Sequence, residues 1–305
     1  MVEIRIGKSD VISGKLGLGT NKVGGHNLFK NLDEKDGYEL VRAALDSGIT
    51  VLDTAYMYGL GRSEEIIGEV VKDYDRSKVI IATKAAQDPS KDYQANNDPE
   101  FLTKAVDEAL KRLQTNYIDI FYIHFPDEKT DKAEAVAALN RLKEIGKIRA
   151  IGVSNFSFEQ LKEANRNGQV DIVEDHYSLV HRAVEAERFT YLREHQISFV
   201  PYFPLASGLL TGKYTLADSS KFEQFSKAQF ETIIKGLEQV RKISDEHEAT
   251  VMQVILAWYM KNPDIAEVIP GARNAAQVSG IADSLNVVLT DEEYHVIDTA
   301  FASFK

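Results

Sequence analysis

The chain has 305 residues, of which 44% are hydrophobic and 27% charged, which is ordinary for a globular protein with a large core. Its 36 Lys and Arg against 47 Asp and Glu give a net charge of −11. This charge argues against nucleic acid or an anionic membrane as the main partner, but a few local cations could still hold an anionic ligand. No cysteine is present, which excludes disulfides, cysteine–zinc sites and a cysteine nucleophile.

The beginning of the chain carries no targeting signal. Residues 1–6 lack the basic region and the long apolar stretch of a signal peptide. No segment approaches the roughly 20 apolar residues that cross a bilayer. We therefore expect a cytoplasmic protein without a membrane partner.

In chain order, the sequence opens with a hairpin over residues 3–14 and then alternates between strand and helix patterns. The predicted strands are 15–20, 50–53, 79–83, 118–123, 148–153, 171–174, 197–202 and 266–269. The predicted helices cover residues 40–45 with an end at Gly48, a segment from the N-cap Ser63, a segment from Asp98 with Pro99 in its first turn, 131–146, 157–167, 184–195, parts of 226–261, 274–283 and a segment from Thr290. Residues 214–226 are polar and predict a loop.

Eight strand–helix units in one chain predict a (β/α)8 TIM barrel. The N-terminal hairpin and extra C-terminal helices would be additions to a single domain over residues 1–305. Runs such as 79–82 are apolar throughout, as expected of parallel strands buried on both faces. The alternative, an open doubly wound sheet, normally has fewer repeats.

Chemically capable side chains follow three neighbouring predicted strands. Asp53 and Tyr58, Lys84, and His124 stand where strands 50–53, 79–83 and 118–123 end. Active sites of TIM barrels form at the C-terminal ends of strands, so these side chains can converge. An ammonium favours the phenolate of a nearby tyrosine, and a carboxylate holds the ammonium in place. The set suits protonation of a carbonyl oxygen by Tyr58 while hydride reaches the carbon, with His124 orienting the oxygen.

Each of these residues also has an ordinary structural interpretation. Asp53 could cap a helix or pair with a cation, Lys84 could be solvated, Tyr58 could be a rim aromatic and His124 a loop histidine. Their joint placement on consecutive strands favours a site.

Other chemistries are poorly supported. His247-Glu248 lacks the second histidine of a zinc-protease helix, and His176 and His181 are interpreted as loop or surface residues, so no metal site is predicted. No Gly-x-Ser-x-Gly is present for a hydrolase, and Gly17-Leu18-Gly19 lacks the third glycine of a dinucleotide fingerprint.

Two late loops could hold a phosphate. Residues 203–213 and 269–274 follow the last two predicted strands, where barrels commonly bind phosphate. The first offers small residues and Lys213, and the second offers Arg273, which could clamp a phosphate. Either segment could also be an ordinary glycine-containing loop.

On these residues, the sequence resembles the aldo-keto reductase superfamily over about residues 3–300. Residues 52–59, 82–84 and 123–127 resemble the segments of the family's catalytic tetrad, which implies the roles of Asp53, Tyr58, Lys84 and His124. Residues 17–21 and 201–205 look most like the bacterial branch associated with inositol-catabolism genes.

The resemblance also implies residues that bind NADPH or NADP. Ser154 and Asn155 would bind the nicotinamide carboxamide, Tyr202 would stack on the ring, and Gly271, Arg273 and Gln277 would surround the adenosine 2′-phosphate. The full set of expected cofactor contacts is Gly19, Thr20, Asn21, Ser154, Asn155, Glu174, Tyr202, Pro204, Leu205, Ser207, Gly208, Leu209, Lys213, Gly271, Arg273 and Gln277.

Two positions depart from the family pattern. Glu174 stands where glutamine is usual, which predicts an altered ratio of affinities for oxidised and reduced cofactor. Gly280-Ile281 replaces an acidic residue and asparagine near the adenine, which predicts weaker contacts there.

The resemblance implies NADPH-dependent reduction of small aldehydes or ketones to alcohols, with Tyr58 as general acid. The alternative is a nucleotide-binding redox sensor or regulatory subunit with little turnover. The sequence specifies neither the physiological substrate nor the oligomeric state.

Overall fold

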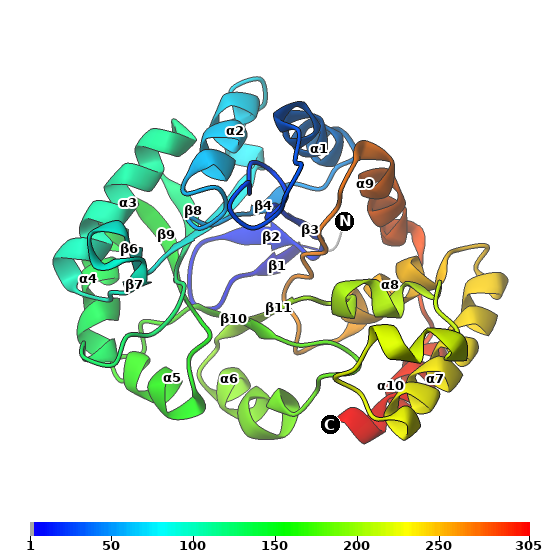
Figure 1. Cartoon of the computed structure of the whole chain (residues 1–305). Coiled ribbons are helices and arrows are strands. Elements are labelled where there is room, and N and C mark those ends of the chain that lie inside the picture. The colour runs from blue at the N-terminus through cyan, green and yellow to red at the C-terminus, as the bar shows by residue number, and fades with distance from the viewer. Residues whose placement is uncertain (1–2) are drawn as a thin grey trace.

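The computed structural model describes residues 3–305, so residues 1 and 2 of the predicted domain lie outside the described residues. An antiparallel pair, β1 (Glu3–Arg5) and β2 (Ile12–Gly14), occupies the predicted hairpin. Ile6 and Val11 hydrogen-bond across its turn, and their buried side chains pack against apolar residues inside the ring of strands. Figure 1 shows this pair at the centre of the ring. The hairpin therefore plugs one end of it.

A parallel sheet of seven strands forms the framework of the molecule. Its order is β11-β10-β9-β8-β5-β4-β3, so neighbours in the sheet follow one another along the chain. The strands are β3 (Gly17–Gly19), β4 (Val51–Asp53), β5 (Ile80–Ala85), β8 (Ile118–Ile123), β9 (Ile148–Ser154), β10 (Ile172–His176) and β11 (Ser198–Tyr202).

Residues 266–271 link the two edges of this sheet. The N–H of Ala266 donates to the carbonyl of Phe199 in β11, and the N–H groups of Gly17 and Gly19 in β3 donate to the carbonyls of Val268 and Pro270. Only isolated parallel bridges form here, so the predicted strand 266–269 is an extended segment rather than a regular strand. The curled sheet and this link are consistent with the predicted (β/α)8 barrel, because an open sheet has two free edges.

Helices surround the sheet on the outside (Figure 1). They are α1 (Glu34–Asp46), α2 (Arg62–Val71), α3 (Pro99–Leu113), α4 (Lys132–Glu144), α5 (Phe158–Ala164), α6 (Thr190–Glu194), α7 (Lys227–Glu246), α8 (Val251–Lys261), α9 (Ala275–Ala282) and α10 (Asp291–Ala300). None of the helices in residues 3–305 is long and apolar enough to cross a membrane.

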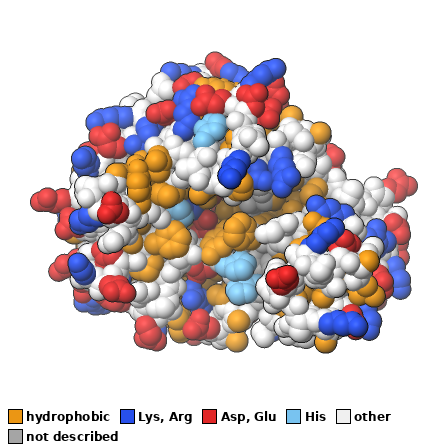
Figure 2. All heavy atoms as spheres, viewed as in Figure 1, with side chains coloured by type: hydrophobic (Ala, Val, Ile, Leu, Met, Phe, Trp, Pro, Cys, Tyr) orange, Lys and Arg blue, Asp and Glu red, His pale blue; other side chains and the backbone are white. Residues whose placement is uncertain are grey.

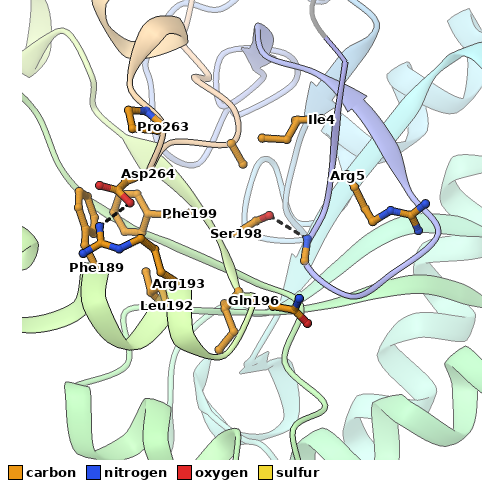
Figure 3. A pocket seen from close by; sticks show the side chains of 13 residues that line it. Ile4, Arg5, Phe189, Leu192, Arg193, Gln196, Ser198, Phe199, Pro263 and Asp264 are labelled. Atoms are coloured by element: carbon orange, nitrogen blue, oxygen red, sulfur yellow. Dashed lines mark hydrogen bonds and ion pairs between the residues drawn. The ribbon is translucent and has the colours of Figure 1, made fainter.

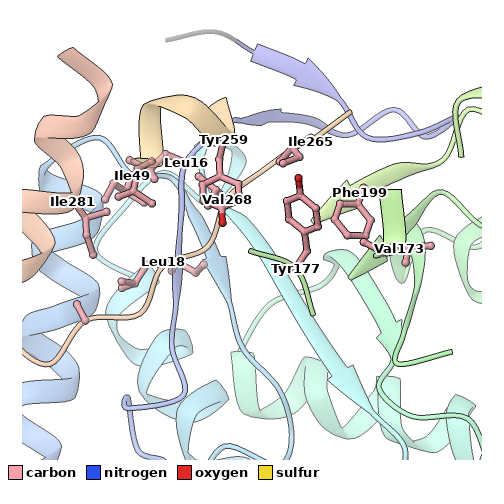
Figure 4. Close-up of a cluster of buried hydrophobic side chains, with 14 of the residues drawn as sticks. Leu16, Leu18, Ile49, Val173, Tyr177, Phe199, Tyr259, Ile265, Val268 and Ile281 are labelled. Carbon is pink, nitrogen blue, oxygen red and sulfur yellow. The ribbon is translucent and has the colours of Figure 1, made fainter. Parts of the chain in front are cut away.

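The apolar residues form two cores, because side chains alternate between the two faces of each strand. Val51, Ile120 and Val200 point into the ring. Leu52, Phe121 and Phe199 point outward, toward the helices. Figure 4 shows part of the outer core, where Val173 and Phe199 of the sheet lie in one cluster with side chains from other elements. The strands are thus buried on both faces, as their apolar runs predicted.

Several local expectations were wrong. Helix α2 begins after Gly61, and Ser63 lies inside its first turn with its hydroxyl bonded to Thr54 rather than capping the helix. The predicted helix 184–195, by contrast, does form, as a π-helical turn over Glu185–Phe189 that continues into α6. The loop predicted over 214–226 contains a 3₁₀ helix, Leu216–Lys221. A small hairpin, β6 (Gln87–Asp88) with β7 (Gln94–Ala95), follows β5 and was not predicted.

Candidate active site

A buried ion pair lies at the carboxyl ends of β4 and β5. Lys84 Nζ lies 2.6 and 2.7 Å from the two carboxylate oxygens of Asp53 and also donates to the carbonyl of Thr54 at 3.0 Å. Both side chains are almost fully buried. These contacts fix the ammonium, because three acceptors surround its three N–H groups.

Tyr58 and His124 lie above this pair and are partly exposed. The Tyr58 ring centre is 5.7 Å from Lys84 Nζ and 6.5 Å from the His124 ring, which meets it edge-on. The backbone next to Tyr58 is tightly packed. Gly59 has a positive φ of +72°, and a Cβ added to Gly59 would lie 1.9 Å from the carbonyl oxygen of Gly24. The structure therefore brings together all four residues of the expected tetrad, with the charges below and the phenol and imidazole above.

The ionisation of these groups differs in part from the expectation. Burial raises the pKa of Tyr58 above its ordinary value, and the charge of Lys84 opposes this rise without cancelling it. Burial alone would lower the pKa of Lys84, but the charges of Asp53 and Glu174 raise it. Burial, helped by Lys84, lowers the pKa of His124 to about 3. At neutral pH the site therefore holds a neutral phenol, an ammonium and a neutral imidazole.

Glu174 on β10 is a further member of this charge cluster. Its Oε2 lies 3.2 Å from Lys84 Nζ, and its side chain is almost fully buried. The sequence placed Glu174 among the cofactor contacts, and the structure places it against Lys84 and Asp53. A sequence pattern could not show this, because the three residues are far apart along the chain.

Polar side chains beside His124 connect β9 to β11. Asn155, at φ +60°, donates from Nδ2 to the carbonyl of His124 and to Ser154 Oγ. Its Oδ1 accepts a hydrogen bond from the Tyr202 hydroxyl at 2.8 Å. The three residues expected near a nicotinamide thus lie in one bonded group next to the tetrad.

The loop after β11 has an unusual backbone. Ala206, Ser207 and Gly208 all have positive φ, and Gly212 follows at +80°. A Cβ built on Gly208 would lie 3.6 Å from Lys213 Nζ, so that lysine reaches over the loop. The N–H groups of Ala206 and Gly208 donate to the carbonyls of Phe203 and Leu205, so the ammonium of Lys213 is the feature of this loop that suits an anion. The side chains of Pro204 and Leu209 are buried, whereas Leu205 and Ser207 remain accessible.

The end of β3 meets the loop before α9. Gly19 pairs with Gly271, and Asn21 Oδ1 lies 3.7 Å from where a Cβ of Gly271 would stand. Gln277 accepts a hydrogen bond from the backbone N–H of Arg273.

Lys22 is a further cation in this region, and it was not among the cofactor contacts predicted from the sequence. Burial is the main cause that lowers the pKa of Lys22, and the nearby charge of Arg273 lowers this pKa further. Two neighbouring cations that repel each other suit an anionic ligand, which would relieve the repulsion. Thr20, by contrast, is fully buried and bonds to the Asp53 carbonyl, so its side chain supports the tetrad.

A hollow lies at the centre of the face drawn in Figure 2, bordered by apolar side chains, histidines and cationic side chains. The exposed aromatic residues near the tetrad are Phe125, which packs on His124, and Phe203, which packs on Tyr202. His176 stacks between His181 and Tyr202, so these histidines belong to the rim as the surface interpretation expected.

A separate cavity of about 190 Å³ lies at the hairpin end of the strands (Figure 3). It is lined by residues of β1, α6 and the start of β11, and the Arg193–Asp264 ion pair crosses its edge. None of the tetrad residues lines it. Within the part of the chain that the structure describes, no three His, Asp or Glu side chains are grouped to hold a metal ion.

Comparison with known sequences gives a consistent result. Residues 15–301 match the model of the Aldo/keto reductase family. The chain is 33% identical to Aldo-keto reductase YhdN of Bacillus subtilis, covering 96% of this chain and 92% of the relative. It is 32% identical to an NADH-specific methylglyoxal reductase of Escherichia coli, covering 96% of both. A probable voltage-gated potassium channel subunit beta of Arabidopsis thaliana is 29% identical, covering 90% of both.

Solved structures agree with this match. A glycerol dehydrogenase from Gluconobacter oxydans superposes with a TM-score of 0.85 at 32% identity, covering 99% of this chain and 95% of the other. An aldo/keto reductase from Klebsiella pneumoniae, solved with NADP and acetate, superposes with a TM-score of 0.73 at 26% identity, covering 98% of this chain and 95% of the other. The branch associated with inositol catabolism stays a prediction.

Proposed function

The chain belongs to the aldo/keto reductase family, and on this premise we propose that it reduces aldehydes or ketones to alcohols with NADPH, with Tyr58 as the proton donor. The observation that carries the proposal is the buried Asp53–Lys84 pair beneath the half-exposed Tyr58 and His124. That arrangement offers a proton and a hydrogen-bonding imidazole at one point of an open hollow.

Each residue of the tetrad has a separate task in this proposal. Tyr58 is protonated at neutral pH, because burial raises its pKa, so it holds the proton that a reduced carbonyl oxygen needs. Lys84 stabilises the phenolate that remains, and Asp53 keeps the ammonium in place. His124 stays neutral and can position the carbonyl oxygen by hydrogen bonding.

The residues of three loops fit a nicotinamide nucleotide, which supplies hydride when bound. Lys213, beside the positive-φ loop at Ala206–Gly208, suits its pyrophosphate. Tyr202 and Asn155 suit its nicotinamide, and Arg273 with Lys22 suits a phosphate on the adenosine. The NADP in the Klebsiella pneumoniae structure supports NADPH, and the NADH-specific Escherichia coli relative makes the preference worth measuring.

The test is the consumption of NADPH with a reactive aromatic aldehyde, repeated with NADH. We expect Tyr58→Phe to lower kcat at least about 100-fold, since a positioned general acid contributes that much, while NADPH still binds. Tyr56→Phe is the matched control, because Tyr56 lies in the same loop but packs against Arg112. Full turnover in Tyr58→Phe would overturn the role of Tyr58.

The second candidate function is a redox-sensing or regulatory subunit, favoured by the similarity to a plant channel subunit beta. Tight NADPH binding without turnover on any of several carbonyls would support it. A partner retained from an extract only when NADPH is present would then identify the regulated protein.

A further inference from the structure

We propose that Glu174 is a positioning residue that carries a proton at neutral pH, and that its neutral state keeps Tyr58 able to give up its own proton. This inference rests on the proposed reductase function for its kinetic part. The proton on Glu174 is a property of the protein alone.

The geometry gives the two carboxyl groups different roles. Asp53 holds Lys84 with both oxygens, at 2.6 and 2.7 Å, so it keeps the negative charge of the cluster. Glu174 Oε2 lies 3.2 Å from Lys84 Nζ but forms no hydrogen bond with any group in residues 3–305, and the Glu174 carboxyl lies against the Asp53 carboxyl. A buried carboxylate without hydrogen bonds is costly, whereas a protonated carboxyl is neutral.

The surrounding charges act in the same direction. Glu174 faces Asp53, Lys84, Tyr58, Tyr122 and Tyr202, and Lys84 is the one cation of this set. One ammonium cannot balance two carboxylates in a site that excludes water. Burial raises the pKa of Glu174 well above its usual value, and the charge of Asp53 raises it further, against the opposing effect of Lys84.

The consequence reaches Tyr58 through charge alone. If Glu174 is neutral, Asp53 and Lys84 cancel and the phenolate of Tyr58 adds one negative charge to a balanced cluster. If Glu174 is ionised, the phenolate forms beside an excess negative charge, which raises the pKa of Tyr58 further. Reduction therefore slows at the pH where Glu174 loses its proton.

The first test is infrared spectroscopy of the whole protein without added cofactor. The difference between the parent and Glu174→Gln at neutral pH should contain the C=O stretch of one protonated carboxyl group. Glu267→Gln is measured for comparison, because Glu267 is another buried carboxyl whose pKa burial raises to about 7, so its band should fade as the pH rises through about 7 while the Glu174 band persists. Absence of the Glu174 band at neutral pH would overturn the proposal.

The second test is the pH dependence of carbonyl reduction. Glu174→Gln carries an amide, which has no proton to lose in this pH range, so its kcat should decline less at alkaline pH than that of the parent. At the alkaline pH where the infrared band of the parent disappears, the ratio of alkaline to neutral kcat should be about tenfold higher in the variant, which corresponds to one unit of pKa on Tyr58. An identical alkaline decline in both proteins would overturn the kinetic part.

The two failures are distinguishable. If no carbonyl is reduced by the parent protein, the proposed function fails, and the infrared band still decides whether Glu174 holds a proton. Glu174→Met is a second variant of similar length, for use if the glutamine variant does not fold. Its difference from the parent must contain the C=O stretch of one protonated carboxyl group, and absence of that band would overturn the assignment.

Discussion

At the scale of single residues, the site depends on charges that are held below the surface. Lys84 is surrounded by Asp53, Glu174 and the rings of Tyr58 and Tyr122, whose centres lie 5.7 and 5.5 Å from its ammonium. Removing one partner of such a pair leaves the other buried and uncompensated. Asp53 and Lys84 are therefore part of the buried interior as well as of the proposed catalytic site.

His124 predicts how the stability of the protein depends on pH. Its pKa is about 3 in the folded protein and about 6.5 when unfolded, so between these values the unfolded state binds more protons. Stability therefore falls as pH drops below about 6.5, by about 1.4 kcal/mol per unit for this one group. Between neutral pH and about pH 4.5, the free energy of unfolding should therefore fall by about 2 kcal/mol less in His124→Gln than in the parent.

Urea unfolding at neutral pH and at about pH 4.5 measures this difference. His295→Gln is the control, since His295 is an exposed residue of α10. Equal losses of unfolding free energy in the parent and in His124→Gln would show that His124 can be protonated in the folded protein without penalty.

The positions of the tetrad could be predicted because the residues follow successive strands, and strand ends of a parallel sheet meet at one edge. The environment of each residue could not. The sequence suggested that Lys84 makes Tyr58 easier to ionise, whereas burial outweighs that effect. Ser63 has the composition of an N-cap, yet it bonds to Thr54 and Thr20, because the contact depends on how loops pack.

At the scale of elements, β8 and β9 fit together only because residue 152 is glycine. A Cβ on Gly152 would lie 2.2 Å from Cδ1 and 2.4 Å from Cε1 of Tyr122, whose ring is buried inside the strands. We expect Gly152→Ala to lower the free energy of unfolding by about 1–3 kcal/mol or more, the usual cost of overpacking a core. Turnover should fall too, because the displaced Tyr122 ring lies directly beside Lys84.

Chemical denaturation of Gly152→Ala beside Gly37→Ala checks this prediction. A Cβ on Gly37 in α1 would meet Val23 at an ordinary 3.4 Å, so alanine should stabilise that helix by up to about 1 kcal/mol. Unchanged stability in Gly152→Ala would mean that β8 and β9 can separate without cost.

The strong apolar runs, such as those of β5 and β8, could be located from sequence because both faces of these strands are buried. Elements with weak or mixed hydrophobic patterns could not be located in this way. Residues 266–271 link both sheet edges but pair only at single bridges, since Pro270 lacks an N–H to continue a ladder. The β6–β7 hairpin joins strands of only two residues each, too short to show a period.

At the scale of the whole molecule, a net charge of −11 opposes any anionic cofactor. The proposed affinity for NADPH would then rest on local features, for which the candidates are the positive-φ loop with Lys213 and the neighbouring cations Lys22 and Arg273. NADPH differs from NADH only by the 2′-phosphate, so a cation that contacts this group stabilises one complex and leaves the other unchanged.

Thermal unfolding with saturating NADPH or NADH measures this preference, because a ligand at 100 times its Kd stabilises the folded state by about 2.7 kcal/mol. We expect NADPH to raise the Tm of the parent more than NADH does at equal concentration. Arg273→Ala should remove about 1.5–3 kcal/mol of this advantage, the usual contribution of a hydrogen bond to a charged group. Arg42→Ala removes the same charge from a surface pair with Asp73 and should keep the full advantage. Equal shifts by the two nucleotides in the parent would instead show that the 2′-phosphate is not recognised, and the paired cations Lys22 and Arg273 would then need another anion to explain them.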